Sequence, residues 1–151
     1  MKPIIAAVDG SDSALAAVSL AAVIANALDA ELILLGVGHL VAMEHDPGWQ
    51  AFVNAEHPSE IGDEVLPANT SENLTKAHER ALASGAGRIR TVARSGDPTA
   101  EIIEQIRQDQ AEMVVVGSRG LGLLSGLLLG SVSQKLAHHA PCSVLIVRGS
   151  T

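Results

Sequence analysis

Aromatic residues are almost absent from this chain of 151 residues, which contains only Trp49 and Phe52 and no tyrosine. A core must therefore be built from valine, isoleucine, leucine and alanine, which suits buried parallel strands covered on both faces by helices. Apolar residues make up 47% of the chain and charged residues only 18%. That balance suits a sheet covered on both faces better than a half-solvated sheet or a disordered chain. The length predicts one domain over residues 1–151.

Cysteine is limited to Cys142, so an intrachain disulfide and a cysteine-based metal site are both excluded. Positive charge is also scarce, because the chain has 10 Lys and Arg but 17 Asp and Glu, which gives a formal net charge of −7. Nucleic-acid binding depends on cations that neutralise phosphates, so we expect no nucleic-acid partner. A nucleotide is compatible with this charge, because backbone N–H groups at a helix start hold phosphate without a cationic surface.

Apolar runs are too short for a membrane span or for the core of a signal peptide. The first such run covers only residues 4–8, and the alanine-rich stretch 14–28 is interrupted by Ser19 and Asn26. A membrane helix needs about 20 consecutive apolar residues, and a signal peptide needs a longer apolar core than the first run offers. We therefore expect a cytoplasmic protein that makes no membrane contact.

Short β-branched runs alternate with helical stretches, a pattern typical of βαβ units and a parallel sheet. The predicted strands are residues 3–8, 31–37, 88–94, 113–116 and 143–147, and the predicted helices are 14–28, 71–84, a third from 98, and 131–140. Residues 11–13 offer N-cap side chains to the first helix, and Asp97 with Pro98 starts the third. The pattern predicts one doubly wound α/β domain with five strands and four helices.

Residues 38–67 break this rhythm with prolines, glycines and many acids. A loop of this length inside a compact domain is usually functional. Its histidines, His39, His45 and His57, lack zinc-ribbon spacing, so surface positions are favoured over a metal site.

The most informative segment is residues 117–120 (Gly-Ser-Arg-Gly), followed after nine residues by 130–133 (Gly-Ser-Val-Ser). Glycines let a ligand approach bare backbone, and the second cluster stands at a predicted helix start, where unpaired N–H groups favour an anion. Ser131 and Gln134 have the spacing of a capping box. No Gly-Lys-Ser/Thr follows at Walker spacing, and Ser125 stands where a dinucleotide fingerprint has its third glycine. The segment is interpreted as a phosphate-binding loop of another kind.

The pattern Gly-x2-Gly-x9-Gly-Ser resembles the ATP-binding signature of the universal stress protein family. The resemblance covers nearly the whole chain and includes Val-Asp-Gly-Ser at 8–11, Ser-Gly-Asp-Pro at 95–98 and Ala-Pro-Cys at 140–142. It implies a Rossmann-like sheet with strand order 3-2-1-4-5, in which strands one and four flank a topological switch point. Gly36 departs from the family pattern, because family members usually carry His or a similar side chain there.

The resemblance also implies that the crevice binds ATP. Asp9 and Val37 are expected at the adenosine end. Ribose and phosphates would be held, largely by backbone groups, at Gly117, Gly120, Gly130, Ser131 and Val132. Arg119, which either reaches a phosphate or is solvated, and Ser133 complete the candidate set. Mg²⁺ or Mn²⁺ would be carried by the phosphates rather than by a protein cage.

The leading hypothesis is an ATP-binding regulatory, stress-response module whose nucleotide state changes its contacts with a protein partner through loop 38–67. A homodimer is expected, because the edge strand from Val144 to Val147 is apolar on both faces and the family pairs this strand with its copy. A slow ATPase or phosphotransferase is an alternative, although no nucleophile–base pair stands at the phosphate end, so we expect no enzyme. A nucleotide-independent dimeric scaffold is the third hypothesis, and the intact glycine signature argues against it.

Overall fold

The computed structural model describes residues 1–38, 68–119 and 129–149 of the chain. Its elements are β1 (Ile4–Val8), α1 (Asp12–Ala27), β2 (Leu32–Gly38), α4 (Ala68–Ala83), β3 (Ile89–Ser95), α5 (Pro98–Asp109), β4 (Met113–Gly117), α6 (Ser131–His139) and β5 (Ser143–Val147). The strands form one parallel sheet in the order β3-β2-β1-β4-β5. The predicted fold class and strand order are confirmed.

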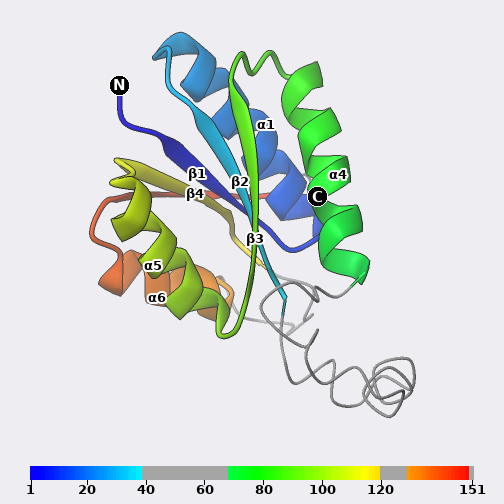
Figure 1. The fold of residues 1–151 in the computed structure, drawn as a ribbon. Helices are drawn as coiled ribbons and strands as arrows, with labels where there is room; N and C mark the ends of the chain where they lie inside the picture. The colour runs from blue at the N-terminus through cyan, green and yellow to red at the C-terminus, as the bar shows by residue number, and fades with distance from the viewer. Residues whose placement is uncertain (39–67, 120–128, 150–151) are drawn as a thin grey trace, which may run out of the picture.

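The sheet is covered on both faces, with α1 and α4 on one side and α5 and α6 on the other (Figure 1). Alternate strand residues point to opposite faces, so each strand contributes to two separate cores. The α1 side is rich in alanine, and Ala17, Ala21 and Ala22 are fully buried there. Larger side chains such as Ile5 and Ile33 fill the α5 side. This asymmetry brings α1 close to the sheet.

Helix starts follow local capping chemistry. The Ser11 hydroxyl accepts the Ala14 N–H at 3.2 Å, so α1 begins at Asp12, two residues before the predicted start. Asp97 caps α5 through the Ala100 N–H at 2.9 Å, with Pro98 in the first helical position as predicted. The other predicted boundaries differ by up to three residues, the most at α4, which begins at residue 68.

Residues 39–67, with the loop and the three histidines predicted in them, lie outside the described residues. Gly38 itself ends β2 instead of starting the loop, because it pairs with Ser95 of β3. Among the helices that the structure describes, none combines the length and apolar character needed to cross a membrane.

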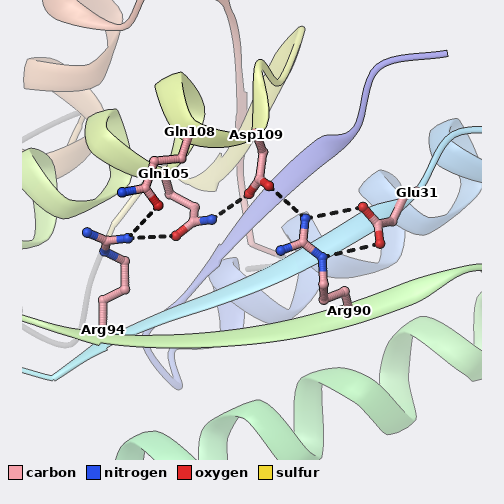
Figure 2. Close-up of polar contacts among 6 residues, drawn as sticks. All are labelled: Glu31, Arg90, Arg94, Gln105, Gln108 and Asp109. Atoms are coloured by element: carbon pink, nitrogen blue, oxygen red, sulfur yellow. Dashed lines mark hydrogen bonds and ion pairs between the residues drawn. The ribbon is translucent and has the colours of Figure 1, made fainter. Parts of the chain in front are cut away.

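A polar network joins the edge strand β3 to α5 (Figure 2). Arg90 Nη2 donates to Asp109 Oδ1 at 2.9 Å, and Arg90 Nε donates to Glu31 Oε1 at 3.2 Å. The buried Gln105 extends the network, because its amide donates to Asp109 while its oxygen accepts from Arg94 Nη1 at 3.0 Å. The network thus holds α5 against β3.

Asp109→Asn is expected to lower the free energy of unfolding at neutral pH by about 1 kcal/mol. Burial alone would raise the pKa of Asp109, but hydrogen bonds from Gln105 and Arg90, together with the positive charges of Arg90 and Arg94, outweigh burial and hold the pKa below its usual value. Hydrogen bonds to a charged group contribute about 1.5–3 kcal/mol. Removing a carboxylate from a helix C-terminus returns about 0.3–1 kcal/mol of that.

The stabilisation by Asp109 depends on pH because its pKa is lowered in the folded state. A carboxyl with a lowered folded-state pKa stabilises the fold above its unfolded pKa of about 3.9 and loses that effect as the pH falls through the folded-state value. Urea unfolding should therefore separate the wild type from Asp109→Asn at pH 7, and the gap should close in acid. Glu104→Gln, on an exposed part of the same helix, is the control. A gap that does not change with pH would contradict the assignment.

Candidate functional site

A cavity of about 180 Å³ opens at the carboxyl ends of β1, β2 and β4. It lies where β1 and β4 are neighbours in the sheet while their helices cover opposite faces, which is the topological switch point of such folds. The residues predicted for the site that line the cavity are Asp9, Val37, Gly117, Arg119, Gly130, Ser131, Val132 and Ser133. Gly120, the remaining predicted residue, lies outside the described residues.

Part of the cavity wall is apolar, and apart from Val37 its residues were not predicted from the sequence. Leu35 joins Val37 from β2, and Pro98 and Ile102 join from the first turns of α5. The spacing within each pair could have indicated this from the sequence, because residues two apart share one face of a strand and residues four apart share one face of a helix. The wall offers a flat base or ring an apolar surface.

Gly36 faces away from the cavity. A Cβ at this position would lie 3.0 Å from Thr70 Cγ2 and 3.1 Å from Leu74 Cγ, both on α4. The alternation that turns Leu35 and Val37 into the cavity turns Gly36 to the opposite face of the sheet. The departure from the family pattern at this position therefore concerns the packing of α4, and the cavity wall is unaffected.

The N-terminus of α6 is the polar end of the cavity. Its N-cap is Gly130, with φ −69° and ψ 163°, and no side chain among the described residues caps the helix. The predicted capping box at Ser131 is therefore wrong, because Ser131 is already inside the helix and the residue in the capping position has no side chain. The first N–H groups of a helix lack intrahelical acceptors, and here Ser131, Val132 and Ser133 carry them beside the cavity. Such a terminus favours an anion.

Three successive carbonyl groups at the end of β4 are held, two by the start of α6 and one by the first turn of α1. Ser133 Oγ donates to the Gly117 oxygen at 2.7 Å, and the Gly130 N–H donates to the Ser118 oxygen at 2.7 Å. Ser13 Oγ donates to the Arg119 oxygen at 2.6 Å. The buried Ser133 hydroxyl thus ties α6 to β4, and the described part of the glycine-rich segment is fixed at both ends.

Asp9 and Arg119 bring opposite charges to the rim of the cavity, and both side chains are exposed. Asp9 Oδ1 accepts the Ser11 N–H at 2.9 Å and the Ser11 hydroxyl at 2.6 Å. The turn between these residues requires Gly10, whose φ of +86° lies in the left-handed region. The turn fixes the carboxylate at the end of β1, beside the apolar wall.

Comparison with known proteins identifies a family. The model of the universal stress protein family matches residues 1–148. The chain is similar to the universal stress protein YxiE of Bacillus subtilis, with 34% identity over 94% of this chain and 95% of that protein. It is also similar to universal stress protein Rv1636 of Mycobacterium tuberculosis, with 32% identity over 97% of this chain and 95% of the relative.

Solved structures show the same likeness. A universal stress protein in complex with cAMP is 31% identical and superimposes with a TM-score of 0.71, covering 99% of this chain and 98% of its own. The crystal structure of Rv1636 gives 32% identity and a TM-score of 0.59, with coverage of 99% and 96%. The family model, the relatives and the fold lead to one conclusion. This chain belongs to the universal stress protein family.

Proposed function

We propose that this protein binds ATP at the cavity between β1, β2 and β4 and acts as a nucleotide-dependent regulatory module in a stress response. The observation that carries the proposal is the N-terminus of α6, whose N-cap Gly130 has no side chain, beside a cavity that is also lined by apolar side chains. A nucleotide has the same two parts, an anionic phosphate chain and a flat base. The universal stress protein solved with cAMP, at 31% identity, supports an adenine nucleotide as the ligand class.

The proposal assigns each part of the nucleotide to described residues. The base would lie on the apolar wall near Val37, with Asp9 at the adenosine end. The phosphates would accept hydrogen bonds from the N–H groups at the start of α6, with Arg119 at the rim. Mg²⁺ or Mn²⁺ would bind the phosphate oxygens, since Mg²⁺ usually keeps several waters and binds through substrate phosphates.

Calorimetric titration of the purified protein with ATP and excess Mg²⁺ tests the proposal. Nucleotide retained from purification is first measured by its absorbance and removed. We expect a micromolar dissociation constant, which corresponds to about −8 kcal/mol. Parallel titrations with AMP and cAMP rank the ligands. Absence of binding by all three to nucleotide-free protein would contradict the proposal and favour a scaffold role.

The proposed role is binding rather than catalysis. Fast hydrolysis needs a general base or a nucleophile at the phosphate end, whereas the carboxylate of Asp9 lies at the proposed adenosine end. The thiol of Cys142 lies in the α6-side core away from the cavity, and burial raises its pKa, so the thiolate is disfavoured. ATP turnover above about 1 per second, the lower end of ordinary enzyme rates, would contradict this proposal.

We further propose a homodimer that pairs β5 with its copy. β5 is an edge of the sheet, and Val144, Leu145 and Ile146 are each half-buried, so both of its faces are apolar. An open apolar edge invites pairing with another strand. Sedimentation velocity at micromolar concentration should show a dimer, and a monomer throughout that range would contradict the proposal.

A further inference from the structure

Ser13 lies in the first turn of α1 and contacts Arg119 in the glycine-rich segment, although 106 positions separate the two residues. Its side chain is buried, and its hydroxyl donates to the Arg119 oxygen at 2.6 Å. The Arg119 N–H approaches the same Oγ at 3.4 Å. A serine hydroxyl has one donor and two acceptor lone pairs, so it can make both contacts together.

Ser11 cannot replace Ser13 as this donor. Ser11 Oγ lies 3.3 Å from the Arg119 oxygen but only 2.6 Å from Asp9 Oδ1. A hydroxyl has a single proton, and the shorter bond to an ionised carboxylate is the stronger one. The Ser11 proton is thus committed to Asp9, which leaves Ser13 as the donor to the Arg119 carbonyl.

Close packing of the backbone makes this contact possible. A Cβ on Gly117 would lie 2.4 Å from Ser13 Oγ, so the missing side chain at that position is what admits the Ser13 hydroxyl. Ser13 is not among the residues that line the cavity, whereas Arg119 and Gly130 are. Any effect of Ser13 on a ligand is therefore indirect, through its neighbour Ala14, which lines the cavity, or through the segment whose carbonyl it holds.

We infer that Ser13 is a positioning residue of the phosphate end of this site, an inference that rests on the proposed function. By holding the Arg119 carbonyl, Ser13 fixes the backbone of residues 117–119. The Ser118 carbonyl in turn accepts the Gly130 N–H at 2.7 Å, which places the start of α6. Ser13 thus orients the N–H groups that receive the phosphates. Its described contact towards Asp9 is the long 3.4 Å approach of its Oγ to Ser11 Oγ, so we expect no corresponding effect on the adenosine end.

The test compares Ser13→Ala with the wild type in titrations with two ligands, Mg²⁺–ATP by calorimetry and adenosine by NMR chemical shifts. We expect ATP binding to weaken about tenfold, since tenfold corresponds to about 1.4 kcal/mol, the order of one hydrogen bond. Adenosine binding should not change. Ser19→Ala is the matched control, because within the described part of the chain the Ser19 hydroxyl bonds inside α1, to the Leu15 oxygen at 3.3 Å.

The pair of ligands separates positioning from general support of the fold. Equal weakening of ATP and adenosine, or no weakening of either, would overturn the inference while leaving the proposed function intact. Failure of the wild type to bind ATP would overturn both. Ser13→Cys retains a similar volume but supplies only a weak donor. Its affinity for ATP should therefore lie between those of Ser13→Ala and the wild type. Wild-type affinity in Ser13→Cys would also count against the hydrogen bond.

Discussion

Gly117→Ala is expected to lower the free energy of unfolding by about 3 kcal/mol, the upper range for adding a methyl group to a packed interior. The new Cβ would lie 2.4 Å from Ser13 Oγ and 2.7 Å from both Ala14 N and the Ser13 carbonyl carbon. Two of these atoms belong to the backbone of α1, which cannot rotate away as the end of a side chain can. Relief of the overlap requires α1 and β4 to separate.

Urea unfolding followed by circular dichroism measures this effect, and Gly87→Ala is the matched control. A Cβ on Gly87 would have only Asn26 Oδ1 within reach, at 3.9 Å, and the residue has no positive φ. We expect Gly87→Ala to stay within about 1 kcal/mol of the wild type. A loss below 1 kcal/mol for Gly117→Ala would mean that α1 does not pack against β4 as closely as described.

Gly130→Asp should abolish ATP binding while leaving the fold at least as stable. Aspartate is a preferred N-cap residue, and its carboxylate would accept the N–H groups that Gly130 leaves uncapped. It would also repel the phosphates, and two unit charges about 4 Å apart repel by about 4 kcal/mol near a protein surface. Both effects act against ATP, so the affinity should fall by at least about 100-fold, which needs only about 2.7 kcal/mol.

Two further variants at this position separate charge from steric effects. Gly130→Asn supplies a comparable cap without the negative charge, so its loss of affinity should be smaller. Gly130→Ala adds a side chain but no capping group, so it should bind ATP nearly as the wild type does. Calorimetric titration of the three variants provides the comparison. Wild-type affinity in Gly130→Asp would exclude the α6 N-terminus as the phosphate site.

The architecture was predictable because its signals are local. Apolar strands, helical stretches and capping residues such as Asp97 follow one another at short spacings, and the structure confirms the resulting elements. The glycine-rich segment was identified in the same way, and the structure brings its described residues together with Asp9 and Val37 at one cavity. Those signals fix which elements form and at which end of the sheet the loops gather.

The contacts that complete the site depend on tertiary packing and were not predicted. The bond between Ser13 and Arg119 joins the first turn of α1 to the segment after β4, which no local pattern relates. The N-cap of α6 is Gly130, one residue before Ser131, which the capping-box spacing had favoured. Gly130 has an extended backbone and Ser131 is already helical. The sequence showed that Gly36 departs from the family pattern but did not predict that strand alternation directs this position to α4.

The alanine-rich face of α1 has a consequence for how a disturbance spreads through the molecule. Alanine loses no side-chain entropy on folding and has no alternative rotamer to adopt when a neighbour changes. Ala17, Ala21 and Ala25 are buried on α1 and cannot absorb a shift of their neighbours by changing rotamer. A displacement of the first turn of α1 therefore has to be accommodated by movement of the whole helix. Such a movement would carry a change at the cavity to the far end of the sheet.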